Sequence, residues 1–256
     1  MSVALELSGR RILVVGASSG VGRAVAELSA RAGARVVLAA RRRDRLDAAA
    51  EALTGAGHTA FALACDVTDE AQCRSAVAQA IERLGGLDGF VYASGLSPLC
   101  LLAEAGQADW RSVLDVNLIG ASLVTAAALD ALRASHGRAV YVGSYSERQT
   151  LPGIGLYSVS KKALSALIEA WRMEHPEVDF TKVVLGNTMG TEFAEGWGRE
   201  RTLAITKLWI DRGLFPAPKM MPLANAAEAI CAVLAVRGHV DEIGVMPRLH
   251  DLQLET

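Results

Sequence analysis

The stretch Arg11-Ile12-Leu13-Val14-Val15-Gly16-Ala17-Ser18-Ser19-Gly20-Val21-Gly22 decides the fold of this chain. Its first five residues are compact and mostly β-branched, which predicts a buried strand. The glycines that follow permit a tight turn and a close approach of the backbone to a pyrophosphate, and a helix expected from Gly20 to Ala32 would point its free amides at those phosphates. We therefore predict nucleotide binding by Gly16, Ser18, Ser19, Gly20, Val21 and Gly22.

Short apolar runs alternate with longer amphipathic segments along the rest of the chain. The further strands are expected at 35–40, 59–65, 89–93, 138–142, 179–185 and 242–246. The further helices are expected at 42–53, 69–84, about 109–134, 157–174 and 225–236. The strand runs are almost continuously apolar, which is typical of parallel strands covered on both faces. This pattern predicts an α/β fold, a doubly wound parallel sheet in a single domain over 1–256, with an inserted helical flap at about 190–224.

The end of the second expected strand indicates which nucleotide binds. Ala39 and Ala40 lead into Arg41-Arg42-Arg43, and no acidic residue precedes Asp44. An acid at this point would bind the adenosine ribose hydroxyls and repel a 2′-phosphate, whereas arginine can bind a phosphate with two parallel hydrogen bonds. We predict that Arg41 binds the 2′-phosphate, which favours NADP(H) over NAD(H). The alternative is a solvated start of the next helix.

Composition limits the classes of function. The 256 residues carry a net charge of -2, so there is no basic surface to suggest nucleic acid as a partner. No run of about 18 uninterrupted apolar residues indicates a membrane span, and the first residues lack the features of a signal peptide. The four cysteines and five histidines show no metal-ligand spacing. We expect a cytoplasmic protein with reduced thiols, no metal and no membrane partner.

Tyr157 and Lys161 stand four residues apart in an expected helix and therefore share one face. An ammonium group near a phenol favours the phenolate and lowers the pKa of the tyrosine towards neutrality. A tyrosine with such a pKa can give and take protons near working pH. By itself this spacing is common in helices, so its meaning depends on the residues around it.

With these features the chain resembles the short-chain dehydrogenase/reductase family over nearly its whole length. The separations from Asn117 to Ser144 and from Ser144 to Tyr157 are those that the family uses. The resemblance implies a Rossmann-type fold, a nicotinamide cofactor and a catalytic set of Asn117, Ser144, Tyr157 and Lys161. It also implies cofactor contacts from Asp66, Val67, Ala93, Gly95, Tyr157, Lys161, Thr188 and Thr191.

Each member of the catalytic set has a role that the resemblance implies. Tyr157 exchanges a proton with the substrate oxygen, and Ser144 binds that oxygen as charge develops on it. Lys161 lowers the pKa of Tyr157 and holds the nicotinamide ribose. Asn117 holds a water that connects Lys161 to solvent. Members of the family pair through the helices expected here at about 109–134 and 157–174, which implies a homodimer or homotetramer.

The sequence departs from the family pattern in two loops. Tyr92-Ala93-Ser94-Gly95 replaces the usual Asn-Asn-Ala-Gly after the fourth strand, and Gly186-Asn187 replaces Pro-Gly after the sixth. Both loops border the expected cofactor site. They retain Gly95 and Thr191, which the family uses there.

The substrate is expected to be a hydrophobic ketone, aldehyde or alcohol, because the segments that face the site are mainly apolar. The residues concerned are Leu96, Leu99, Leu151, Ile154, Phe193, Trp197, Trp209 and Phe215. The same residues would equally serve to pack the flap onto the sheet. The predicted function is an NADP(H)-dependent oxidoreductase that transfers a hydride between a carbonyl and an alcohol. The alternatives are a nucleotide-binding regulatory or scaffolding protein with little turnover, and an isomerase or dehydratase of the same family.

Overall fold

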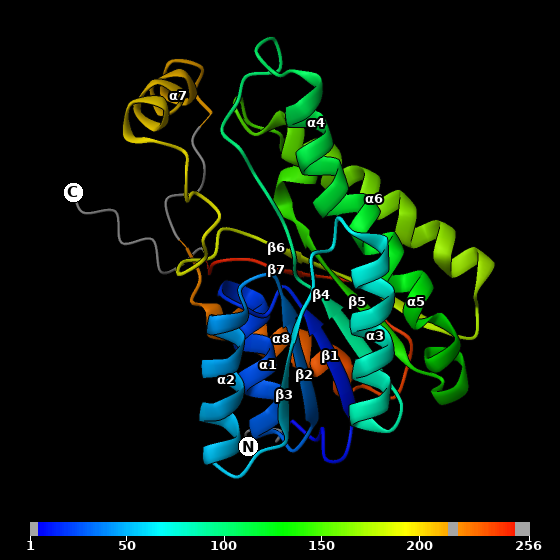
Figure 1. The fold of residues 1–256 in the computed structure, drawn as a ribbon. Helices are drawn as coiled ribbons and strands as arrows, with labels where there is room; N and C mark the ends of the chain where they lie inside the picture. Colours follow the sequence, from blue (N-terminus) through cyan, green and yellow to red (C-terminus); the bar gives the residue numbers. More distant parts are fainter. Residues whose placement is uncertain (1–4, 215–219, 249–256) are drawn as a thin grey trace.

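The computed structural model describes residues 5–214 and 220–248, which form a seven-stranded sheet covered by helices on both faces (Figure 1). The strands are β1 (Arg11–Val15), β2 (Arg35–Ala40), β3 (Ala60–Ala64), β4 (Gly89–Tyr92), β5 (Arg138–Ser144), β6 (Asp179–Leu185) and β7 (Glu242–Val245). They are hydrogen-bonded in the order β3-β2-β1-β4-β5-β6-β7, and every pairing is parallel. The predicted Rossmann-type doubly wound sheet is confirmed.

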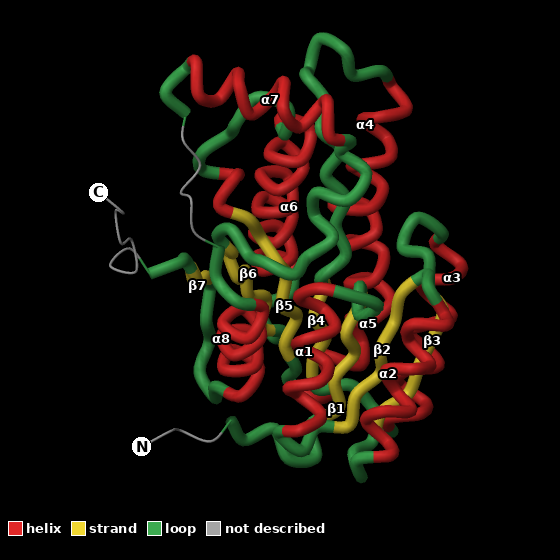
Figure 2. The backbone as a smooth tube through the Cα atoms, turned by 90° about the vertical axis from the view of Figure 1, so that its left-hand side faces the viewer, coloured by secondary structure: helices red, strands yellow, loops and turns green. Residues whose placement is uncertain are grey.

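Two layers of helices enclose the sheet (Figures 1 and 2). One face carries α1 (Gly20–Arg31), α2 (Arg43–Gly55) and α8 (Leu223–Ala235), and the other carries α3 (Glu70–Leu84), α5 (Gly120–Ser135) and α6 (Gly155–Glu174). Successive residues of a strand serve opposite layers, because Cβ atoms alternate across a strand. Ile12 and Val14 pack with the first group, while Leu13 and Val15 pack with the second. The apolar runs are continuous because both faces are buried.

The strand order reverses at β1 and β4, and the loops that leave these two strands meet at the carboxyl edge of the sheet. A Cβ atom added at Gly16, which has a φ of 89°, would lie 2.6 Å from the backbone nitrogen of Ser94. A Cβ at Gly22 would lie inside van der Waals contact with the carbonyl oxygen of Gly16. Glycine is therefore required at both positions. In doubly wound sheets, this point of reversal is where ligands bind.

The helix expected at about 109–134 is interrupted by a π-helical turn. It comprises α4 (Gln107–Leu114), the π segment Asp115–Ile119 and α5. The Tyr92 hydroxyl donates a 2.5 Å hydrogen bond to the carbonyl oxygen of Val116 inside this turn. Asn117, the next residue in this turn, has no exposed surface. Sequence periodicity could not reveal it, because one extra residue in a helix hardly changes the apolar pattern.

The combined helix Gln107–Ser135 is long and apolar enough to cross a membrane, with a mean hydropathy of 1.7 in its most apolar window. Length and composition alone are weak grounds for a span, because core helices pass the same test. Val124, Ala128 and Leu132 of this helix are buried in the core against the sheet. We interpret it as a core helix of the α/β domain.

The flap is shorter than expected, because α8 begins at Leu223 and residues 215–219, including Phe215, lie outside the described part of the chain. Its helix α7 (Arg199–Asp211) buries Ile205 against Leu99 and Ile154. Two tryptophan side chains join it to the loops beneath. Trp197 Nε1 donates to the Ser97 carbonyl at 2.7 Å, and Trp209 Nε1 donates to the Pro152 carbonyl at 2.8 Å. These residues pack the flap onto the domain.

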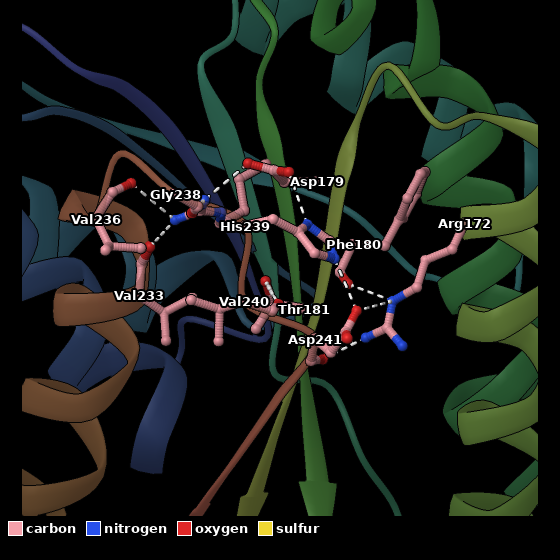
Figure 3. Close-up of polar contacts among 11 residues, drawn as sticks. Arg172, Asp179, Phe180, Thr181, Val233, Val236, Gly238, His239, Val240 and Asp241 are labelled. Carbon is pink, nitrogen blue, oxygen red and sulfur yellow. Dashed lines mark hydrogen bonds and ion pairs between the residues drawn. The ribbon is translucent and has the colours of Figure 1, made fainter.

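A cluster of charged side chains lies at the amino ends of β6 and β7 (Figure 3). His239 lies between two carboxylates, 2.8 Å from Asp179 and 2.7 Å from Asp241, and these contacts raise the pKa of the imidazole. Arg172 Nε donates to the Phe180 carbonyl at 2.7 Å. Because Asp179 begins β6, the cluster lies at the amino ends of the strands, away from the Gly16 turn. It ties the segment before β7 to the sheet.

Candidate active site

Tyr157 and Lys161 lie on the first turns of α6 and are almost fully buried, with exposed fractions of 8% and 3%. Lys161 Nζ stands 5.6 Å from the centre of the Tyr157 ring, so the helical spacing brings the two side chains together as predicted. The ammonium group donates a 2.8 Å hydrogen bond to the Val142 carbonyl of β5. Ser144 ends the same strand, and its hydroxyl contacts that of Ser146 at 2.9 Å.

The pKa of Tyr157 is raised, although the sequence led us to expect that it would be lowered. Burial raises it to about 12, and a hydrogen bond with Ser144 opposes this rise. Burial lowers the pKa of Lys161 to about 8. The expectation was wrong for the protein alone because Lys161 directs its nitrogen to Val142 rather than to the phenol oxygen, and removal from water dominates both groups. At pH 7 Tyr157 is protonated and Lys161 is mostly charged.

Asn117 holds the loop that follows β4. Its Oδ1 accepts from the backbone nitrogen of Leu96 at 2.7 Å, and its Nδ2 donates to the Leu96 carbonyl and to Ser160 Oγ. A Cβ added at Gly95 would lie 3.8 Å from Asn117 Oδ1 and 3.9 Å from Lys161 Nζ, so both polar groups face Gly95. Asn117, Gly95 and Lys161 therefore converge as predicted. The water-holding role of Asn117 stays a prediction.

Phe193 of the flap covers Tyr157. The two rings are 5.0 Å apart between centroids and nearly perpendicular, at 74°. Phe193 and Leu96 remain 39% and 40% exposed, whereas Leu99 and Ile154 are buried beneath α7. The expected substrate residues thus divide into two groups. Phe193 and Leu96 are accessible beside the site, and most of the others pack the flap.

The glycine-rich turn is held by Arg42, not by Arg41. Arg42 Nη2 donates to Ser18 Oγ and to Ser19 Oγ, each at 2.8 Å. Arg41 is exposed and makes no hydrogen bond or ion pair with other described residues. Neighbouring residues of an extended segment point in opposite directions, so a run of three arginines cannot show which one faces the turn. The structure therefore moves the candidate phosphate ligand from Arg41 to Arg42.

Glu192 is a residue of this region that sequence reasoning missed. Its carboxylate accepts hydrogen bonds from Arg42 at 2.7 and 3.0 Å, from Arg45 at 2.5 Å and from Ser19 Oγ at 2.8 Å. These bonds, chiefly that from Arg42, lower the pKa of Glu192 to about 2. No spacing in the sequence connects Glu192 with Ser19, because the contact exists only once the flap has folded over α1.

The remaining predicted cofactor residues border the same edge of the sheet. A Cβ added at Gly20 would lie 3.7 Å from the Cα atom of Thr191, which is an ordinary contact distance. A Cβ added at Gly22 would lie 3.2 Å from the Cβ atom of Ala93. Thr188 Oγ1 donates to the Gly186 carbonyl at 3.0 Å. Asp66 and the buried Val67 follow β3. Asp66 Oδ1 accepts hydrogen bonds from both the backbone and the hydroxyl of Thr68.

A second missed residue, Glu147, lies one short helical turn after Ser144 and is 6% exposed. Its carboxylate accepts from Lys182 Nζ and from Ser165 Oγ, both at 2.8 Å. Lys182 also pairs with Glu242 at 2.8 Å, and Glu242 pairs in turn with Arg148. The negative charge of Glu147 raises the pKa of both Tyr157 and Lys161.

The site provides a cradle for a nucleotide and a proton donor beside it. The cradle consists of the turn that requires glycine at Gly16 and Gly22, the amino end of α1 and the side chains of Ser18, Ser19 and Arg42. These residues fit a dinucleotide phosphate. Among the described residues, no group of three or more His, Cys, Asp and Glu side chains is placed to hold a metal ion.

An α/β sheet with this cradle and a Ser-Tyr-Lys set, in which Tyr157 and Lys161 are buried, is typical of a nucleotide-dependent oxidoreductase. The chain belongs to the short-chain dehydrogenase family, because the family model described as short chain dehydrogenase matches residues 10–202. Members of this family use NAD(P) and act on hydroxyl or carbonyl groups.

Similar proteins agree with this assignment. A glycine betaine reductase of Emericella nidulans is 37% identical over 66% of this chain and 13% of its own length. An 11-beta-hydroxysteroid dehydrogenase of Sesamum indicum is 34% identical over 71% of this chain and 53% of its own length. The chain thus matches about half of the second relative and a small part of the first. An alcohol dehydrogenase from Thermococcus sibiricus, solved with 5-hydroxy-NADP, is 26% identical over 92% of this chain and 95% of its own, with a TM-score of 0.80.

Proposed function

We propose that the chain is an NADP(H)-dependent oxidoreductase that interconverts a ketone or aldehyde and an alcohol, with Tyr157 as the general acid and base. The observation that carries this proposal is the placement of Ser144, Tyr157 and Lys161 beside the glycine cradle. The nicotinamide nucleotide supplies or accepts the hydride when it is bound. Every other step falls to side chains of this chain.

Tyr157 is suited to donate a proton to a carbonyl oxygen, because its raised pKa keeps the phenol protonated at neutral pH. Ser144 would donate a hydrogen bond to the same oxygen as negative charge develops there. Lys161, which is mostly charged at pH 7, would stabilise the phenolate that proton donation leaves behind. These protonation states favour reduction of a carbonyl near neutral pH and oxidation of an alcohol at alkaline pH.

Preference for NADP(H) rests on the charges at the turn. Arg42 donates hydrogen bonds to Ser18 and Ser19. Arg42 and Arg45 both donate to the carboxylate of Glu192. Two guanidinium groups at the end of β2 suit a 2′-phosphate better than a ribose hydroxyl. We propose Arg42 as the principal phosphate ligand. Arg41 remains the sequence-based alternative.

The substrate we propose is a hydrophobic carbonyl compound or alcohol. Phe193 packs on Tyr157, and Leu96 is exposed on the loop beside it, so the side chains nearest the acid are apolar. The Sesamum indicum relative is named for a hydroxysteroid, which agrees with a large apolar substrate. We further propose a homodimer or homotetramer, because α6 leaves the apolar side chains of Val159 and Met173 exposed. A cytoplasmic location is proposed from the sequence alone.

The test is NADPH oxidation with a panel of apolar ketones, followed for wild type, Tyr157→Phe, Arg42→Ala and Arg41→Ala. Loss of the general acid should lower kcat/KM by about 100- to 10,000-fold. Arg42→Ala should raise the Kd of NADPH by about 10- to 100-fold and leave that of NADH nearly unchanged. Arg41→Ala is the matched control with little effect. Turnover that survives Tyr157→Phe would refute the catalytic assignment, and a wild type that turns over none of the ketones would favour the regulatory alternative.

A further inference from the structure

The carboxylate of Glu192 occupies a site made of hydrogen-bond donors. Arg42, Arg45 and Ser19 all donate to it, and Arg42 also binds Ser18. The donors come from two separate parts of the chain, the turn before α1 and the start of α2, and the carboxylate comes from the flap. Arg42 and Glu192 are 37% and 28% exposed at their side chains, so the pair is half-buried rather than a solvated surface contact.

The chemistry of this site matches a phosphate monoester. A carboxylate presents two oxygens and one negative charge, whereas a phosphate monoester presents three oxygens and a charge of about −1.5 to −2. Two guanidinium groups and the hydroxyls of Ser18 and Ser19 can therefore satisfy a phosphate more completely than they satisfy Glu192. Among the described residues, only one carboxylate, that of Glu192, is hydrogen-bonded to the two arginines, whereas a phosphate monoester carries close to two negative charges.

We propose that Glu192 determines cofactor specificity by occupying the site of the 2′-phosphate, so that NADP(H) must displace this carboxylate and NAD(H) need not. The inference rests on the proposed NADP(H) function. Glu192, a residue of the flap, would then compete with the 2′-phosphate of the cofactor for the same arginines. The side chain that competes is held by Arg42, which is also the proposed ligand of the phosphate.

Displacement of Glu192 also affects the catalytic end of the site. The next residue, Phe193, packs on Tyr157 with ring centroids 5.0 Å apart. A carboxylate that leaves Ser19 and Arg42 therefore removes one of the contacts that hold Phe193 over the phenol. Occupation of the phosphate site and access of substrate to Tyr157 are coupled through these two adjacent residues.

Glu192→Gln tests the proposal, because it keeps the size of the side chain and removes its charge. The Kd values of NADPH and NADH are measured by titration calorimetry for both wild type and variant. A half-exposed ion pair contributes up to about 1 kcal/mol, so the Kd of NADPH should fall by about three- to fivefold. The Kd of NADH should change by less than about twofold. Glu192→Ala should also lower the Kd of NADPH. Agreement between the two variants would show that the effect does not come from a new contact made by glutamine.

Glu195→Gln is the matched control. It removes an equal charge from an exposed position in the same segment, and Glu195 influences Arg42 through space without a hydrogen bond to it. It should change the Kd of NADPH much less than Glu192→Gln does. An equal gain in both variants would show that general charge, not occupation of the site, is responsible, and would overturn the inference.

Arg42→Ala separates failure of this inference from failure of the proposed function. If Arg42→Ala weakens NADPH binding but Glu192→Gln leaves it unchanged or weakens it, the cofactor proposal stands and the inference is wrong. A selective loss of NADH affinity in Glu192→Gln would show that the carboxylate binds a ribose hydroxyl instead, and would also overturn it. If neither variant changes NADPH binding and wild type prefers NADH, both proposals fail together.

Discussion

Replacement of Lys161 by methionine should make the protein more stable at neutral pH while it abolishes activity. The buried ammonium group has its pKa lowered from 10.5 to about 8. That difference corresponds to about 3 kcal/mol against the charged form in the folded state. Methionine also removes the hydrogen bond to the Val142 carbonyl, which costs about 1 kcal/mol. The expected net gain in the free energy of unfolding at pH 7 is about 2 kcal/mol.

The gain should disappear as the pH rises. The folded-state pKa of Lys161 lies below the unfolded value, so the unfolded chain binds more protons between about pH 8 and 10.5. Stability of the wild type therefore increases with pH across this window and is lost as pH falls through about 8. At pH 10 the charge-related difference is only about 1 kcal/mol, which the lost hydrogen bond offsets. Wild type and variant should then be about equally stable.

The assay is urea unfolding of wild type, Lys161→Met and Lys162→Met at pH 7 and pH 10, with kcat/KM for ketone reduction measured on the same samples. Lys162 is exposed on the neighbouring position of α6, so its variant should match wild type in both stability and activity. Lys161→Met should lose activity by about 100-fold or more. A variant that is less stable than wild type at pH 7, or whose gain is equal at both pH values, would refute the reasoning about a buried charge.

Three further substitutions test the surroundings of the site. Glu147→Gln removes a charge that raises the pKa of Tyr157 and Lys161, so the basic limb of the pH profile of kcat/KM should move to lower pH. A basic limb that stays in place or moves to higher pH would contradict this. Gly22→Ala should lower Tm by about 5 °C because its Cβ meets the Gly16 carbonyl, whereas Gly55→Ala, which meets nothing within 4 Å, should not. Phe193→Ala should raise KM for apolar ketones by about two- to tenfold, with kcat nearly unchanged; an unaltered KM would place the substrate elsewhere.

The sequence predicted the fold because each strand is marked by a continuous apolar run and each turn by glycine. It predicted the catalytic set because Tyr157 and Lys161 share a helix, whose spacing is fixed by local geometry. It favoured Arg41 as the phosphate ligand, whereas Arg42 is the arginine that binds the turn, because side-chain direction depends on the twist of the chain after β2. The π turn at Asn117 was not predicted, because a single added residue leaves helical periodicity nearly intact.

Contacts between distant segments were beyond sequence reasoning altogether. Glu147 meets Lys182 and Glu192 meets Arg42 only after β5, β6 and the flap have been placed around the sheet. Neither carboxylate differs in the sequence from an ordinary surface residue. Both belong to the charge distribution around Tyr157 and the glycine turn, so the pKa values and the cofactor preference of the site depend on residues that no local motif contains.

The way the flap is attached limits what cofactor binding can move. Trp197 and Trp209 fix the flap to the Ser97 and Pro152 carbonyls, and Ile205 of α7 is buried against the loops beneath. These neutral contacts do not respond to the charge of a nucleotide. Glu192 does respond, because its bonds to Arg42 and Ser19 exchange directly for bonds to a phosphate. Cofactor binding should therefore act locally, on Glu192 and the adjoining Phe193, while α7 stays in place on Leu99 and Ile154.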